Sequence, residues 1–143
     1  MEKVLLVDDE ESIRDLCARI LRGEGYDIDT AANGREALTC CQDNTYDLVI
    51  TDVRMPDMDG FSLIDAIHDI SPEVPTVVMT GYATMDYALG AIRRGVNAFV
   101  MKPFGRGEFL AAVGDALKKY RTERVKARLR FLLPLFELSQ TLL

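Results

Sequence analysis

The stretch Val4–Asp9 reads VLLVDD, four apolar residues followed directly by two acids. Short apolar runs recur at Leu48–Ile50, Val77–Met79 and Ala98–Met101, and each is too short to form a helix. Continuous apolar runs of this length are typical of strands that are buried on both faces of a sheet. A weaker strand is predicted at Asp27–Ala31. The sequence therefore predicts five short strands.

Segments with helical periodicity separate these strands. In the first of them, apolar residues recur three or four positions apart, and the segment ends at Gly23. The apolar residues of this segment are Ile13, Leu16, Cys17, Ile20 and Leu21. Strand and helix then alternate with short connections, which predicts parallel strands, right-handed crossovers and helices on both faces of the sheet. The predicted class is α/β, with ligands bound at the carboxyl ends of the strands.

Length and charge limit what the chain can do. Its 143 residues, 48% of them apolar, are enough for one domain with a core and a short additional segment. The net charge of −6 argues against a nucleic-acid-binding body, because phosphate attraction needs a positive surface. The stretch from Lys118 to Arg130 nevertheless carries a net +6, which leaves −12 for the rest of the chain. These two parts are expected to serve different functions.

Cysteine content and hydropathy indicate the compartment. Cys17, Cys40 and Cys41 are odd in number, and two of them are adjacent, so no disulfide framework is expected. No charged-then-apolar leader opens the chain, and no apolar run approaches the ~20 residues that a membrane helix requires. These features predict a cytoplasmic protein without a membrane span.

Polar residues follow the apolar runs at the points where the strands should end. Asp8 and Asp9 follow the first run, and Asp52 follows the run that begins at residue 48. Thr80 and Lys102 follow the two later runs. Because the carboxyl ends of parallel strands meet at one edge of the sheet, we expect these five side chains to lie close together. Three carboxylates there would repel one another unless a cation joined them, which predicts a Mg²⁺ site.

A lysine and a threonine beside such a metal site are suited to a phosphoryl group. The metal and Lys102 would neutralise the phosphoryl oxygens, Thr80 would donate a hydrogen bond, and one carboxylate would be the nucleophile. Each residue alone has an ordinary explanation, since aspartates after strands often cap helices and lysines are usually solvated. The combination of all five favours the functional interpretation.

Four motifs resemble the receiver family of response regulators in two-component signal transduction. They are VDDE at residues 7–10, DVRMPDMDG at residues 52–60, MTGY at residues 79–82 and MKPF at residues 101–104. The resemblance covers roughly residues 3 to 120. It implies a receiver domain over residues 1–120 with a flavodoxin-like (βα)5 three-layer sandwich, whose parallel sheet has the strand order 2-1-3-4-5.

The resemblance also implies a role for each residue of the motifs. Asp52 would accept the phosphoryl group from a sensor histidine kinase or a phosphotransfer protein. Asp9 and Asp52 would bind Mg²⁺ directly, together with the backbone carbonyl of Arg54, and Asp8 would support the metal. Lys102 would pair with the acceptor or its phosphate. The chain would be a regulatory phosphoacceptor and not an enzyme, with no cofactor other than Mg²⁺.

Signal output is implied by the same resemblance. After transfer, Thr80 would turn inward to bond a phosphoryl oxygen, and Phe99 would move into the space that it leaves. This change would repack the face made by the fourth helix, the fifth strand and the fifth helix, and a homodimer could form there or through the C-terminal helix. Arg54 and Tyr82 stand where they would shield the phosphoryl group and slow its loss. The peptide bond before Pro103 is expected to be cis.

The basic stretch continues with helix-forming residues and an apolar stripe at Val125, Leu129, Leu132 and Phe136. Residues 121–143 are therefore expected to form a helical extension or linker toward an output or dimerisation element. A coiled-coil linker is the preferred interpretation, with a solvated tail and a membrane-surface helix as alternatives. The pattern stops within an apolar helix, as in a fragment of a larger regulator. No DNA-reading helix pair is visible, so no direct nucleic-acid contact is expected from this segment.

Two other functions compete with the phosphorylation switch. A haloacid-dehalogenase-like phosphatase also uses an aspartyl phosphate, but it places the nucleophile after the first strand in a D-x-D pattern, whereas this chain has adjacent Asp8 and Asp9. A phosphate-independent adaptor would need only the fold. The presence of the whole set of polar strand-end residues disfavours the adaptor.

Overall fold

The computed structural model describes residues 1–82 and 84–118 and contains a five-stranded parallel sheet. The strand order is β2-β1-β3-β4-β5, so the predicted fold class and strand order are confirmed. The strands are β1 (Lys3–Val7), β2 (Asp27–Ala31), β3 (Leu48–Asp52), β4 (Thr76–Thr80) and β5 (Ala98–Met101). All neighbouring strands in this order pair in parallel, which places their carboxyl ends along one edge.

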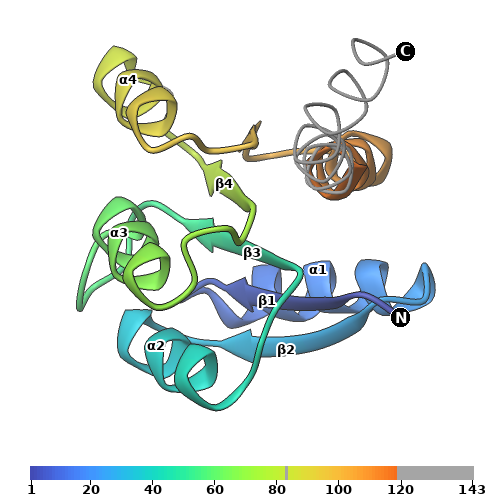
Figure 1. The fold of residues 1–143 in the computed structure, drawn as a ribbon. Helices are drawn as coiled ribbons and strands as arrows, with labels where there is room; N and C mark the ends of the chain where they lie inside the picture. Colours follow the sequence, from blue (N-terminus) through green and yellow to red (C-terminus); the bar gives the residue numbers. More distant parts are fainter. Residues whose placement is uncertain (83, 119–143) are drawn as a thin grey trace, which may run out of the picture.

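Helices cover both faces of this sheet (Figure 1). They are α1 (Glu11–Gly23), α2 (Gly34–Asp43), α3 (Gly60–Ile70), α4 (Met85–Arg93) and a further helix over residues 106–118. Figure 1 shows α1 and the helix at 106–118 on one face and α2, α3 and α4 on the other, which makes three layers. Among the described residues, no helix is both long and apolar enough to cross a membrane. The predicted extension over residues 121–143 lies outside the described residues.

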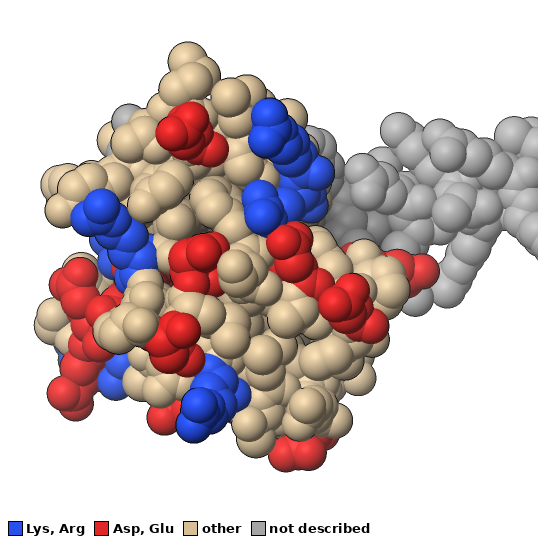
Figure 2. Space-filling view, turned by 90° about the vertical axis from the view of Figure 1, so that its left-hand side faces the viewer, with Lys and Arg blue, Asp and Glu red and all other residues tan. Residues whose placement is uncertain are grey.

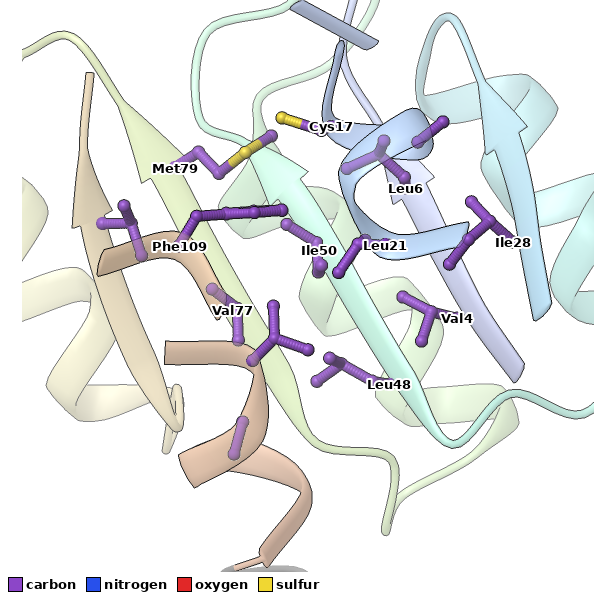
Figure 3. Close-up of a cluster of buried hydrophobic side chains, with 14 of the residues drawn as sticks. Val4, Leu6, Cys17, Leu21, Ile28, Leu48, Ile50, Val77, Met79 and Phe109 are labelled. Carbon is purple, nitrogen blue, oxygen red and sulfur yellow. The ribbon is translucent and has the colours of Figure 1, made fainter. Parts of the chain in front are cut away.

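The core explains why the strands are apolar on both faces. Along β1, Val4 and Leu6 point into a cluster with α1 and the helix at 106–118, where Phe109 is completely buried (Figure 3). Leu5 and Val7 point the other way and pack with residues of α2 and α3. Burial of one such aliphatic side chain stabilises a fold by about 1.5 to 3 kcal/mol. Both layers of helices are therefore held by the same strands.

β3 extends beyond its apolar run at the end that carries Asp52. Leu48–Ile50 was the predicted core of β3, yet the strand continues through Thr51 and Asp52, which pair with Val78 and Met79 of β4. Both added side chains are buried. Strand pairing with β4 therefore holds Asp52 at the last position of a central strand.

Glycine permits α3 to start directly against the end of β3. A Cβ atom at Gly60 would overlap the backbone carbonyl oxygen of Asp52, and the N–H of Gly60 donates to the carbonyl of Val53 over 2.7 Å. Asp59 precedes it and caps α3 by accepting the N–H of Ser62. The loop that leaves Asp52 is thus brought back against the strand end.

Candidate functional site

The carboxyl edge of the sheet brings together three charged residues from different strands. Asp8 follows β1, Asp52 ends β3, and Lys102 follows β5. The ammonium of Lys102 lies between the two carboxylates, with Nζ at 2.8 Å from Asp8 Oδ2 and 2.9 Å from Asp52 Oδ2. The side chains of Asp8 and Asp52 are 0% and 7% exposed. The predicted convergence of these three residues is therefore observed.

Backbone groups fix both carboxylates in this position. Asp8 Oδ1 accepts the N–H of Glu10 over 2.9 Å, and the carbonyl of Asp8 accepts a bond from the Arg14 guanidinium over 2.7 Å. Asp52 Oδ1 accepts the N–H of Arg54 over 3.3 Å. The peptide bond between Lys102 and Pro103 is cis, as predicted. Each carboxylate therefore has one oxygen toward a backbone amide and one toward the ammonium.

Burial and charge act in opposite directions on these groups. Burial of Asp52 raises its pKa above the ordinary range, and the nearby Asp8 carboxylate raises it further, while Lys102 acts to lower it. Burial would lower the pKa of Lys102, but its bonds with Asp8 and Asp52 outweigh this effect and the pKa is raised. Lys102 thus remains a cation between two acids that are costly to bury.

The donor set at this edge fits a hard divalent cation. Carboxylate oxygens of Asp8, Glu10 and Asp52 lie within 4.8 Å of one another. Oxygen ligands of this kind are those that Mg²⁺ prefers. Glu10 was not among the predicted ligands, although its place directly after the two aspartates was a signal for it. Asp9 is exposed and does not belong to this group of three; it lines a neighbouring cavity instead.

The two predicted switch residues lie on adjacent strands. Thr80 is buried at the end of β4, and its hydroxyl accepts the N–H of Tyr82 over 3.1 Å. Phe99 of β5 is partly buried and packs against a cluster that includes Phe61 of α3 and Ala91 of α4. In this conformation the Thr80 hydroxyl is bound to the following loop and not to Asp52. Phe99 packs in the cluster of side chains that α4 covers through Ala91.

Arg54 joins the two loops beside the site. Its guanidinium lies over the ring of Tyr82, 3.7 Å from the ring centroid, and its Nε donates to the hydroxyl of Tyr87 on α4 over 3.3 Å. Stacking of a guanidinium on an aromatic ring is favourable. A cavity of about 530 Å³ lies next to this bridge, and Asp9, Arg54 and Tyr87 contribute to its walls. The side chain of Arg54 therefore spans from the loop after β3 to α4.

Comparison with known proteins identifies the family. The family model described as the response regulator receiver domain matches residues 4–114. The DNA-binding transcriptional regulator NtrC of Salmonella typhimurium is 36% identical over 121 residues, which is 85% of this chain but 26% of that protein. The chain therefore spans about a quarter of this curated relative.

Solved structures give the same result for the described fold. A CheY-like response regulator receiver domain protein from Methanospirillum hungatei is 29% identical with a TM-score of 0.82, covering 86% of this chain and 98% of that chain. A beryllofluoride-activated NtrC4 receiver domain dimer is 41% identical with a TM-score of 0.79, covering 84% of this chain and 99% of that chain. The family match over most of the sheet and helices, together with the bridged aspartates at its edge, means that this chain belongs to the response regulator receiver domains.

Proposed function

We propose that Asp52 accepts a phosphoryl group from the phosphohistidine of a sensor kinase or phosphotransfer protein, and that the chain thereby acts as a phosphorylation-activated signalling switch. The observation that carries this proposal is the position of Lys102 Nζ, at 2.8 Å and 2.9 Å from the buried carboxylates of Asp8 and Asp52. The ammonium of Lys102, held between two carboxylates beside oxygens that could bind a divalent cation, is suited to neutralising a phosphoryl group. We assign the chain as a regulatory phosphoacceptor and not as an enzyme that turns over a substrate.

The residues at this edge have distinct roles in the proposed transfer. A carboxylate oxygen of Asp52 attacks phosphorus while the bond from phosphorus to the donor nitrogen breaks, and the donor leaves with that electron pair. Lys102 stabilises the negative charge of the phosphoryl oxygens. Asp9, Asp52 and the carbonyl of Arg54 would hold Mg²⁺ directly, and Asp8 would support the metal. The metal, when bound, supplies further neutralisation of the phosphoryl oxygens.

Signal output is proposed to begin at Thr80. Its hydroxyl would exchange the N–H of Tyr82 for a phosphoryl oxygen, and Phe99 would follow by repacking beneath α4. A rearrangement there would change the surface of α4, where Met85, Leu89 and Ile92 are 74%, 40% and 74% exposed. These residues are spaced by four and three positions and so share one face of the helix.

We propose that α4, β5 and the helix at 106–118 supply the surface for a homodimer. The exposed apolar residues of α4 support this, and the NtrC4 receiver domain was solved as a dimer in its beryllofluoride-activated form.

Direct nucleic-acid binding by this segment is not proposed, because the net charge is −6 and acidic side chains are interspersed with basic ones on the face that carries α2, α3 and α4 (Figure 2). We assign the receiver domain to residues 1–120 and a linker to residues 121–143. We also propose that the protein is located in the cytoplasm.

Acetyl phosphate tests this function in the purified protein. With Mg²⁺ present, the intact mass should rise by one phosphoryl group, and removal of the metal with a chelator should abolish the gain. An unchanged mass under both conditions would support the phosphate-independent adaptor. Steady release of phosphate from a phosphate ester would instead support the phosphatase.

The bridge made by Arg54 predicts a long phosphoryl lifetime. Its guanidinium lies over the ring of Tyr82, 3.7 Å from the ring centroid, and we propose that this pair shields the phosphoryl group on Asp52 from an attacking water. Arg54→Asn should remove the cover, place an amide there and accelerate phosphate loss about tenfold or more, within the range of general acid–base effects. Phosphate release from the isolated phosphoprotein measures this rate. Arg54→Lys is the control that keeps the charge and most of the length, and loss of phosphate from the unaltered protein within seconds would contradict the prediction.

A further inference from the structure

The loop between β3 and α3, residues 53–59, determines the geometry of the site. It carries the backbone of Arg54, whose N–H donates to Asp52 Oδ1 over 3.3 Å and whose carbonyl is a proposed Mg²⁺ ligand. The end of the loop is fixed by the bond from the Gly60 N–H to the Val53 carbonyl over 2.7 Å. The position of the Arg54 carbonyl therefore also depends on what holds the middle of the loop.

Asp57, in the middle of this loop, is bound to the start of α2. Its Oδ1 accepts the N–H of Gly34 over 3.1 Å, and its Oδ2 accepts the N–H of Arg35 over 3.0 Å. Amide groups in the first turn of a helix have no acceptor within the helix, so both bonds are available to a side chain from elsewhere. Because both oxygens are engaged, the carboxylate is fixed in orientation as well as in position.

The neighbouring Met58 adds an apolar contact at the same point. A Cβ atom at Gly34 would overlap Cγ and Sδ of Met58, so the lack of a side chain at this position lets Met58 pack directly on the start of α2. Met58 also packs against the buried cluster on this face of the sheet. Two consecutive loop residues thus contact the same turn of α2, more than 20 residues away in the sequence.

The protonation state of Asp57 agrees with this attachment. Desolvation acts to raise its pKa, but bonds from backbone N–H groups outweigh it, those of Gly34 and Arg35 before those of Met58 and Asp57 itself, and together hold the pKa below the ordinary range. The carboxylate is therefore ionised near neutral pH, with both oxygens able to accept. A negative charge at a helix N-terminus is also favourable to the helix dipole.

We propose that Asp57 is a positioning residue for phosphoryl transfer: its carboxylate fastens the loop after β3 to the N-terminus of α2 and so holds the Arg54 carbonyl where Mg²⁺ binds. Asp57 is not one of the three clustered carboxylates and acts only through the loop. The inference rests on the proposed function, because it assigns the metal affinity of that site to a residue outside it.

Two substitutions and one matched control test the inference. Asp57→Ala removes both acceptors, and the Mg²⁺ dissociation constant measured by isothermal titration calorimetry should rise about tenfold, as for other residues that support a metal ligand. Asp57→Asn keeps one acceptor oxygen and should give a smaller rise. The amide hydrogens of Gly34 and Arg35 should exchange faster with solvent in Asp57→Ala. The control, Asn33→Ala, removes the cap that accepts the N–H of Glu36 in the same helix turn but leaves the Asp57 bonds intact.

The outcomes separate this inference from the function on which it rests. A Mg²⁺ affinity within twofold of the original in Asn33→Ala, with a tenfold loss in Asp57→Ala, supports positioning by the loop. Equal losses in both variants would mean that only the stability of α2 matters, and an unchanged affinity in Asp57→Ala would mean that the loop does not need this attachment; either result overturns the inference. If the unaltered protein binds no Mg²⁺, that result contradicts the proposed function itself, whatever the variants show.

Discussion

Replacing Asp52 with asparagine is expected to abolish phosphorylation by acetyl phosphate in the presence of Mg²⁺. The amide keeps the size of the side chain but has no anionic oxygen to attack phosphorus, so the transfer loses its nucleophile. Intact mass spectrometry should show the gain of one phosphoryl group in the original protein and none in the variant. This is the largest functional effect that a single substitution in the chain should produce.

The fold should tolerate this change. Burial already raises the pKa of Asp52, which means that the folded state disfavours its charged form. A neutral amide removes that cost but also loses the charge-assisted bond with Lys102, so the free energy of unfolding should change by only about 1 kcal/mol. Asp69→Asn is the matched control, because Asp69 is exposed on α3 and this variant should keep the full mass gain. A gain that survives in Asp52→Asn would place the acceptor on another residue.

Much of the architecture followed from the sequence because the physical signals are local. Apolar runs of three or four residues identify doubly buried strands, and the periodic segment ending at Gly23 identifies α1, whose bounds the structure gives as Glu11–Gly23. Polar residues placed after these runs must lie at one edge once the strands are parallel. The approach of Asp8, Asp52 and Lys102 was predictable for this reason.

Features that depend on loop conformation could not be predicted in the same way. The apolar run at Leu48–Ile50 gave no sign that β3 continues to Asp52, because that extension depends on pairing with β4. Glu10 joins the carboxylate cluster only because the turn after β1 brings it back toward Asp8. The attachment of Asp57 to α2 involves an exposed acid with no periodicity or spacing that would single it out. Such contacts are set by tertiary packing.

We expect the largest effect on stability from Lys102→Ala, which removes the salt bridges of Lys102 with Asp8 and Asp52. In Lys102→Ala, the carboxylates of Asp8 and Asp52 would remain buried, at 0% and 7% exposure, with no counter-charge. Removing one partner of a buried ion pair costs about 3 to 5 kcal/mol. Chemical denaturation at pH 7 without Mg²⁺ should show a loss of this size. The rate of phosphorylation by acetyl phosphate should also fall, by about 100-fold, because the phosphoryl oxygens lose a fixed cation.

An exposed ion pair provides the control for this loss. Arg106 Nη2 lies 3.0 Å from Glu24 Oε1, but the two side chains are 62% and 45% exposed. Solvent screens such pairs, so Arg106→Ala should lower the free energy of unfolding by no more than about 1 kcal/mol. A similar small loss in Lys102→Ala would mean that the two buried carboxylates are not both charged in the folded protein.

The pH dependence of Lys102→Ala separates lost charge compensation from lost packing. Without the ammonium, the pKa of Asp52 should rise beyond its already raised value, because the two largest contributions that lower it come from Lys102 and only the bond from the Arg54 N–H would remain. A group with a raised pKa in the folded state contributes stability that is present below its unfolded pKa, about 3.9 for aspartate, and is lost as the pH rises through the folded value. The deficit of Lys102→Ala relative to the original protein should therefore shrink as the pH falls from 7 toward 4. A deficit that is constant over this range would indicate a loss of side-chain packing and contradict the electrostatic explanation.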